Sequence, residues 1–183
     1  MLKTWPALHT EKISENRVFS LIRRRARSPR TGLDHDFFLL TTPTWINIVP
    51  ITRSGELVLV RQYRQGVEDF TLEIPGGMMD PRDGAPEDAA ARELLEETGY
   101  RAARLLEMGW VEPNPAIQDT RCHTFLAEDV ERVAPIDQDG GEDLEVVLVP
   151  LSEVGELVRC GRIRHALVIA AFALTFGIGD VVR

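Results

Sequence analysis

Short runs of alternating apolar and polar residues, separated by turn residues, cover most of the chain. Alternation with a period of two, and short continuous apolar runs, are typical of β-strands. The segments with these patterns are 17–25, 36–41, 45–52, 56–64, 70–74, 102–110, 120–126 and 144–149. We expect the first two to pair as an antiparallel hairpin across the polar loop 28–32, and the next two to meet at the turn 53–55.

Three segments are expected to be helices: 86–98, 152–160 and a last one that begins near residue 164. A serine cap and an acidic first turn mark the start of the second. The apolar run 166–176 has about 11 residues, too few to cross a bilayer about 30 Å thick, and is expected to be a buried helix. Strands without regular helix alternation favour a mixed α+β sandwich over a doubly wound sheet.

Composition limits the classes of protein. The chain has 183 residues, 44% of them hydrophobic and 27% charged, as in one globular domain with a sizeable core. The net charge of -8 argues against general nucleic-acid binding, which calls for a basic face. Cys122 and Cys160 have neither metal-ligand spacing nor a disulfide framework, so we expect reduced thiols in a cytoplasmic protein. The N-terminus shows neither a signal peptide nor a membrane anchor.

Charged residues gather in the segment 92–99, Arg-Glu-Leu-Leu-Glu-Glu-Thr-Gly. Glu93 and Glu97 lie one helical turn apart with Glu96 beside them, and three carboxylates this close repel one another unless a cation is present. Hard oxygen ligands select magnesium, calcium or manganese, and magnesium commonly takes part of its shell from substrate phosphates. The segment therefore predicts a divalent-metal site that acts on a phosphate ester or anhydride. The alternative is a solvated helix with an Arg92–Glu96 ion pair, worth about a few tenths of a kcal/mol.

A pair of glycines, Gly76 and Gly77, stands upstream of this helix, after the segment 72–75. Without a side chain, the backbone can turn sharply here and approach a ligand or metal closely. We therefore expect this loop to contribute carbonyl ligands, and the pair favours the metal site over the solvated helix.

The two features together resemble the Nudix box, G-x5-E-x7-R-E-U-x-E-E-x-G-U, in which U is a bulky apolar residue. The resemblance covers the 24 residues 77–100. Its second half is intact from Arg92 to Tyr100, and Gly77 falls on its first glycine. Between Gly77 and Arg92 the chain is one residue longer than the pattern, and the place of the first glutamate is taken by Asp83 or by no clear residue. Because that glutamate usually supports the loop, the insertion concerns the loop more than the chemistry.

The Nudix resemblance implies an α/β/α sandwich with a mixed sheet, and hydrolysis of a nucleoside diphosphate linked to another group, with magnesium or manganese as cofactor. By this resemblance Glu93 and Glu97 are the principal metal ligands, and Glu96 shares a metal or a metal-bound water. The Gly76 carbonyl is a further ligand, and Arg92 holds the carboxylates in place. Such metals polarise phosphoryl oxygens, lower the pKa of a bound water and neutralise charge on the leaving phosphate.

Two features outside the box indicate a subgroup. The segment 60–64, Val-Arg-Gln-Tyr-Arg, resembles the QYR segment of Nudix enzymes that act on ADP-ribose and related nucleoside diphosphate sugars. Arg64 would then bind a substrate phosphate, for which its planar fork of donors is suited. The alternative for Arg64 is an ordinary edge-strand charge. Pro115 lies 15 residues beyond Tyr100 and resembles the downstream proline of the ADP-ribose subgroup. By this resemblance Pro115 is a substrate-binding residue.

The general base in this subgroup usually comes from a mobile acidic loop ahead of a late strand, and the segment 137–143 has that composition. Glu142 is the first candidate for orienting or deprotonating the attacking water, with Asp139 and Glu145 behind it. The alternative is a merely solvated acidic loop. His123 lies on an alternating strand and is expected to be a packed structural residue.

A homodimer is implied by the same resemblance, because in sugar-nucleotide Nudix enzymes a comparable N-terminal region pairs with a second subunit. Residues 1–42 are predicted to form a β-hairpin module with a dimerisation role, and residues 43–183 the Nudix domain. The leading hypothesis is metal-dependent hydrolysis of ADP-ribose or a related sugar nucleotide such as GDP-mannose, without nucleic-acid or membrane partners. The alternatives are an RNA 5′-pyrophosphohydrolase or nucleotide-pool hydrolase, disfavoured by the acidic composition, and a non-catalytic nucleotide-sugar sensor, disfavoured by the intact glutamates.

Overall fold

The computed structural model describes residues 1–137 and 143–177, which fall into two compact units. The first unit comprises Met1–Pro43 and Glu112–Arg121, and the second comprises Thr44–Val111 and the chain from Cys122 onward. Each unit has a β-sheet of its own.

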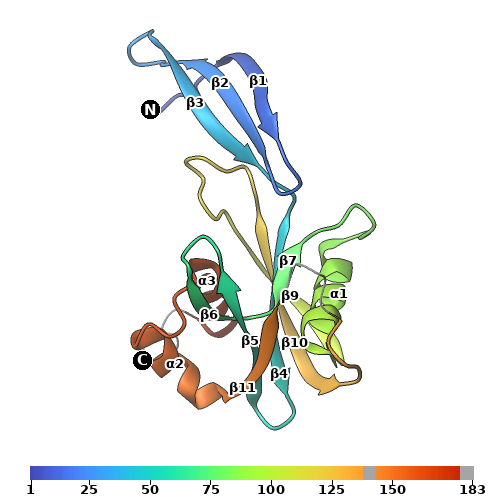
Figure 1. Cartoon of the computed structure of the whole chain (residues 1–183). Coiled ribbons are helices and arrows are strands. Elements are labelled where there is room, and N and C mark those ends of the chain that lie inside the picture. Colours follow the sequence, from blue (N-terminus) through green and yellow to red (C-terminus); the bar gives the residue numbers. More distant parts are fainter. Residues whose placement is uncertain (138–142, 178–183) are drawn as a thin grey trace. The chain divides into compact units, whose positions relative to one another are not determined.

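The first unit is built on a three-stranded antiparallel sheet in the order β1-β2-β3. Its strands are β1 (Ala7–Glu15), β2 (Ser20–Arg27) and β3 (Asp34–Thr41), drawn in blue in Figure 1. The sequence pattern predicted the β2–β3 hairpin but not β1. All but one of the β1 residues are exposed, so no buried face shows in its sequence, and its strand form comes from pairing with β2.

Forked ion pairs join β2 to β3. Arg25 donates from Nε and Nη2 to Asp36 at 2.9 and 3.2 Å, and Arg27 binds Asp34 in the same way at 2.7 and 3.2 Å. A guanidinium bound by two parallel hydrogen bonds has a fixed orientation, so these pairs support the register of the hairpin.

The segment 112–121 belongs to this unit because it is hydrogen-bonded to β3. Leu40 N–H donates to the Ile117 carbonyl at 2.7 Å, and Thr41 Oγ1 donates to Asp119 at 3.0 Å. The division of the chain at residue 42 and the dimerisation role of the module stay predictions.

The second unit contains an eight-stranded sheet and three helices, which confirms the predicted α+β class. Its strands are β4 (Trp45–Thr52), β5 (Glu56–Arg64), β6 (Asp69–Glu73), β7 (Gly76–Met78), β8 (Tyr100–Arg101), β9 (Arg104–Val111), β10 (Cys122–Arg132) and β11 (Leu144–Pro150). The helices are α1 (Pro86–Thr98), α2 (Leu151–Arg159) and α3 (Ala166–Phe176). The strand order is β11-β5-β4-β10-β8, with β6 paired to β5, β7 to β4 and β9 to β10. Strands β4 and β10 run parallel and the other described pairs antiparallel, so the sheet is mixed as predicted.

Helices cover both faces of this sheet, with α1 on one face and α2 and α3 on the other (Figure 1). Strand β4 packs on both sides, because Ile46 and Ile48 contact the core that contains Leu94 of α1, and Val49 contacts the core that contains Phe172 of α3. Alternate side chains of a strand point to opposite faces, so a strand between two cores is apolar at nearly every position. This arrangement is the predicted α/β/α sandwich. In the described part of the chain, no helix has both the length and the apolar character that crossing a bilayer requires.

Two further differences from the sequence prediction concern β7 and β10. The expected glycine loop is the short strand β7, which pairs with β4 from Trp45 to Asn47. Strand β10 continues past the predicted residue 126 to Arg132, through an irregularity at Asp129, where φ is 53°. In both places the strand form depends on the neighbouring strand, which a local pattern does not reveal.

Local signals define both ends of α1. The helix begins at Pro86, a position where the missing N–H has no intrahelical partner to lose, and Asp88 accepts the Ala85 N–H at 2.9 Å. It ends at Gly99, whose φ of 74° is left-handed and whose N–H donates to the Leu95 carbonyl at 2.8 Å.

Candidate active site

Strand β7 brings its two glycines into close contact with neighbouring groups. A Cβ on Gly76 would lie 2.2 Å from the carbonyl oxygen of Ile46, and a Cβ on Gly77 would lie 2.4 Å from Oε1 of Glu93. Neither glycine has a positive φ, so close approach rather than a sharp turn explains the pair. The carboxylate of Glu93 therefore packs directly on the β7 backbone.

The acidic face of α1, which consists of Glu93, Glu96 and Glu97, lies against β7. Glu97 is 4% exposed, and its Oε2 accepts the Gly76 N–H at 2.9 Å. The side chain of Glu93 is 11% exposed, whereas that of Glu96 is 44% exposed. A buried carboxylate needs hydrogen-bond donors or cations around it, so Glu93 and Glu97 depend on their neighbours far more than Glu96 does.

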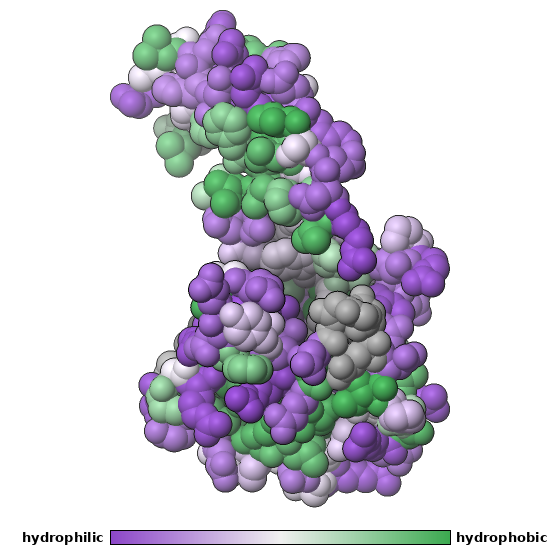
Figure 2. Space-filling view, viewed as in Figure 1, coloured by the Kyte–Doolittle hydropathy of each residue, from purple (hydrophilic) through white to green (hydrophobic). Residues whose placement is uncertain are grey.

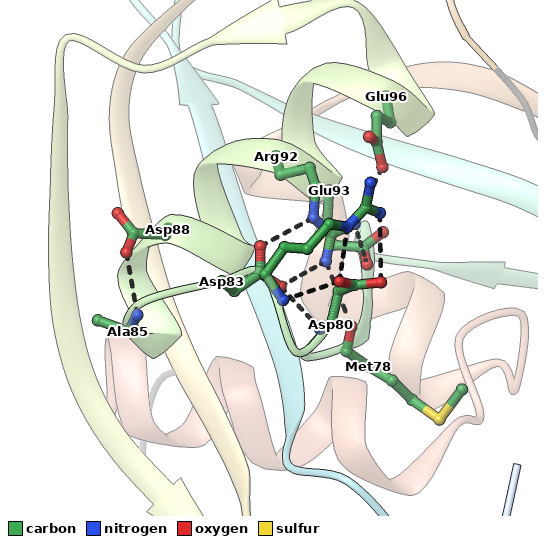
Figure 3. A network of polar contacts seen from close by, with 9 residues as sticks. Met78, Asp80, Asp83, Ala85, Asp88, Arg92, Glu93 and Glu96 are labelled. Carbon is green, nitrogen blue, oxygen red and sulfur yellow. Dashed lines mark hydrogen bonds and ion pairs between the residues drawn. The ribbon is translucent and has the colours of Figure 1, made fainter.

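Arg92 is hydrogen-bonded to two carboxylates of the α1 face, those of Glu93 and Glu96 (Figure 3). Its Nη1 donates to Oε1 of Glu93 at 2.9 Å and to Oε2 of Glu96 at 3.0 Å. Its Nε and Nη2 donate to Asp83 at 3.1 and 2.9 Å, and Nη2 also lies 3.3 Å from the Met78 carbonyl oxygen. The hydrogen bonds that Arg92 donates to Asp83, together with the charge of Glu93, raise the pKa of Arg92 above its ordinary value, although partial burial lowers it.

The place of the first glutamate of the box, which the sequence left open, is taken by Asp83. Its carboxylate accepts the two hydrogen bonds from Arg92 and a third, at 2.8 Å, from the Asp80 N–H. The hydrogen bonds from Arg92 lower the pKa of Asp83, whose side chain is 7% exposed. The inserted residue therefore does not separate the loop from the helix.

The donor set suits a hard divalent cation. The carboxylates of Glu93, Glu96 and Glu97 and the carbonyl of Gly76 offer only oxygen ligands. Among the residues that the structure describes, no three His, Cys, Asp or Glu side chains are close enough together to hold a metal ion. The glutamates instead accept hydrogen bonds from Arg92 and from the Gly76 N–H. Magnesium commonly binds through a few carboxylates and fills the rest of its shell with waters and phosphates. The oxygen ligands of these glutamates and of Gly76 therefore fit such an ion.

A pocket of about 590 Å³ adjoins β7. Its wall comes from β4, the β5–β6 hairpin, β7 and the start of α3, and includes both glycines together with Trp45, Arg64, Glu73, Met78, Arg164 and His165. The glycines thus line the pocket and also contact the acidic face, Gly76 through Glu97 and Gly77 through Glu93. A ligand in this pocket would lie next to the backbone that the two glutamates contact.

Arg64, the predicted phosphate ligand, lies on the wall of this pocket in an ion pair with Glu73. Its Nε and Nη2 donate to the two carboxylate oxygens at 3.0 and 2.7 Å, and Thr71 Oγ1 donates to Oε1 at 2.6 Å. Burial raises the pKa of Glu73, but the hydrogen bonds from Arg64 and Thr71 outweigh it, so the pKa lies below its ordinary value. Binding of a phosphate by Arg64 stays a prediction.

The other residues considered in the sequence analysis fall in four different parts of the chain. Glu142 and Asp139 lie outside the described residues, and Pro115 belongs to the first unit. Glu145 on β11 forms an exposed ion pair with Arg61, at 3.6 Å. The Nδ1 of His123 lies 2.7 Å from a carboxylate oxygen of Glu107 on the neighbouring strand, a contact of the kind expected for a structural residue.

Sequence reasoning missed two residues of the pocket wall, Glu73 and His165. Glu73 had a visible signal, because a charged residue within the apolar segment 72–75 is unusual unless it is paired. No pattern in the sequence indicated its partner. His165 precedes α3 and joins the wall only because α3 packs on the sheet beside β4.

The chain is similar to one known protein domain and to several hydrolases. The NUDIX domain model matches residues 42–172. An ADP-ribose pyrophosphatase of Bacillus subtilis (strain 168) is 33% identical over 127 residues, which cover 68% of this chain and 67% of that protein. A GDP-mannose pyrophosphatase of Pectobacterium atrosepticum is 33% identical over 120 residues, 60% of each chain. The crystal structure of an ADP compounds hydrolase superposes with a TM-score of 0.84 at 25% identity, covering 96% of this chain and 94% of that one.

Proposed function

This chain belongs to the Nudix hydrolase family, and on that premise we propose that it hydrolyses the pyrophosphate bond of a nucleoside diphosphate sugar such as ADP-ribose or GDP-mannose. The products are a nucleoside monophosphate and a sugar phosphate. The observation that carries the proposal is the acidic face of α1 packed on Gly76 and Gly77, which also line the pocket. Relatives named for ADP-ribose and for GDP-mannose support this substrate class.

We propose magnesium or manganese as the cofactor, with Glu93 and Glu97 as principal ligands, Glu96 sharing an ion and the Gly76 carbonyl as a further ligand. When bound, such ions polarise phosphoryl oxygens and lower the pKa of a coordinated water. Arg92 already restrains Glu93 and Glu96 by hydrogen bonds, so little side-chain ordering is left for the moment of binding.

Three further assignments follow from the subgroup resemblance and are part of the proposal. Glu142 orients or deprotonates the attacking water. Arg64 binds a substrate phosphate through its guanidinium, and its place on the pocket wall supports this role. Pro115 contributes to substrate binding.

Replacing Gly77 by alanine is expected to lower kcat by about 100-fold, because the new methyl group would displace the Glu93 carboxylate from a distance of 2.4 Å. The fold should persist, since the contacted atoms belong to the end of a side chain. Steady-state kinetics and a thermal melt of the same sample measure both effects. Gly161→Ala is the matched control. Gly161 has a φ of 74° but no atom near its Cβ position, so the variant should have a lower melting temperature and an unchanged kcat. Full kcat in Gly77→Ala would show that Glu93 is not a ligand.

A substrate panel tests the proposed function directly. The protein, supplied with magnesium or manganese, is given ADP-ribose, GDP-mannose and 5′-triphosphorylated RNA, and inorganic phosphate is followed with and without added phosphatase. We expect phosphate from the sugar nucleotides only after phosphatase is added, because hydrolysis of the pyrophosphate bond leaves monoesters. The highest kcat/KM on RNA would identify an RNA 5′-pyrophosphohydrolase instead. Thermal stabilisation by a sugar nucleotide without turnover at any metal concentration would identify a sensor.

We also propose a cytoplasmic homodimer that pairs through the first unit. Figure 2 shows apolar side chains on the surface of this unit, and Phe19, Phe37 and Phe38 are 36%, 38% and 55% exposed. Covering them with a second copy would remove apolar surface from water, and the mass in solution measures this directly. Cys122 and Cys160 are free thiols, which agrees with a reducing compartment.

A further inference from the structure

Glu73 is a buried carboxylate whose partner reaches solvent. Its side chain is 3% exposed, whereas that of Arg64 is 46% exposed. Both residues line the pocket that adjoins β7. The ion pair therefore has one member in the protein interior and the other at the surface where a ligand would bind.

Both carboxylate oxygens of Glu73 have donors. Oε1 accepts from Arg64 Nε at 3.0 Å and from Thr71 at 2.6 Å, and Oε2 accepts from Arg64 Nη2 at 2.7 Å. The Nδ1 of His165 lies 3.8 Å from Oε2. Two parallel bonds fix the plane of a guanidinium as well as its position, which one bond does not.

Two carboxylates of β6, those of Asp69 and Glu73, are possible partners for the Arg64 side chain. In the β5–β6 pairing, the residue opposite Arg64 is Asp69, and the residue opposite Val60 is Glu73. Asp69 is bound by Arg164, so Arg64 lies along the hairpin to reach Glu73. Glu73 is three residues before Gly76, and both line the same pocket as Arg64.

Stability alone does not explain a charged residue at position 73. The cost of removing a carboxylate from water is commonly as large as the attraction to its partner, and apolar replacements of buried ion pairs are often neutral or stabilising. The position lies between Leu72 and Ile74, both of which are buried. A role beyond stability is therefore the better account of Glu73.

We propose that Glu73 is a positioning residue that holds the Arg64 guanidinium on the pocket wall for the diphosphate of the substrate. This rests on the proposed function, in which Arg64 binds a substrate phosphate. A guanidinium carries more N–H donors than one carboxylate can accept, so the same group can bind a carboxylate and a phosphate together. Glu73 does not touch the substrate and acts through Arg64.

A double-mutant cycle tests this with Arg64→Ala, Glu73→Gln and the double variant. The ligand is ADP-ribose with a methylene group in place of the bridging oxygen, and calorimetry gives Kd in the presence of magnesium. We expect Glu73→Gln to raise Kd and KM about tenfold with a much smaller change in kcat, because an interaction made equally in the ground and transition states is lost. In the Arg64→Ala background the same substitution should leave Kd unchanged. Equal effects in both backgrounds would overturn the positioning role.

Two additional variants keep the test decisive. Glu128→Gln breaks another Arg–carboxylate pair in this unit, Arg104–Glu128 at 3.7 Å, and should leave Kd and kcat at their original values. Should Glu73→Gln fail to fold, Arg64→Lys keeps the charge but not the fork, and is expected to raise KM as Glu73→Gln would; an unchanged KM would overturn the proposal. If the unmodified protein binds and hydrolyses sugar nucleotides but the effects of the two substitutions are additive, this inference alone is contradicted. An unmodified protein that neither binds nor hydrolyses them would contradict the proposed function as well.

Discussion

Replacing Glu97 by glutamine is expected to reduce the turnover of a sugar nucleotide by about a thousandfold, which corresponds to about 4 kcal/mol of activation free energy. The amide oxygen of glutamine can still accept the Gly76 N–H that Glu97 binds at 2.9 Å, so the fold should be retained. A neutral amide, however, is a weaker ligand than a carboxylate for a hard divalent ion. The measurement is kcat across a series of magnesium and manganese concentrations, with a thermal melt of each variant.

Glu87→Gln is the control for this substitution. Glu87 lies in the exposed first turn of the same helix, so the same chemical change is made away from β7. Its kcat should equal that of the unmodified protein at every metal concentration. Full activity of Glu97→Gln under limiting metal would show that the acidic face of α1 does not hold the catalytic ion.

The second large effect concerns stability. Arg92→Ala is expected to lower the free energy of unfolding by about 3 kcal/mol in the absence of divalent ions, because Asp83 and Glu93 would remain buried without the guanidinium. Their side chains are 7% and 11% exposed. For a chain of this size, the melting temperature should fall by about 6–12 °C. Added magnesium should recover part of this loss, since a bound cation also offsets the repulsion among the glutamates.

Arg82→Ala is the control. Arg82 lies in the loop that contains Asp83, and its side chain is 85% exposed in its ion pair with Asp80. Exposed ion pairs contribute little to stability, so its melting temperature should be nearly unchanged. Thermal unfolding followed by circular dichroism, in EDTA and in magnesium, provides both comparisons. An Arg92→Ala protein that melts in EDTA at the temperature of the unmodified protein would contradict the holding role of Arg92.

Several elements were predicted with the bounds that the structure has. Strands β4 and β5 and helix α1 span 45–52, 56–64 and 86–98 in both. Two signals explain this agreement. The central strands carry long apolar runs because they are buried on both faces, and α1 has a proline at its start and a left-handed glycine at its end.

The strand β1 shows the opposite case. Its residues are almost all exposed, so the hydrophobic pattern had no buried face to report, and pairing with β2 decides its conformation. The position of Asp83 is similar. The spacing alone left it open whether any carboxylate would meet Arg92 across an inserted residue, because the path of the loop 79–85 depends on what it packs against.

The sequence by itself determined the placing of Glu93, Glu96 and Glu97 on one side of a helix, because helical geometry and capping act over a few neighbouring residues. It also indicated the family and the sandwich architecture, through the resemblance of residues 77–100 to the Nudix box. Only the tertiary structure decided that Gly76 and Gly77 pack against those glutamates. It likewise decided that Asp83 completes the hold on Arg92, and that Arg64 turns to Glu73 rather than to Asp69. These contacts form between segments that the chain brings together only when the sheet and the helices assemble, and no local pattern encodes which of several carboxylates an arginine will then meet.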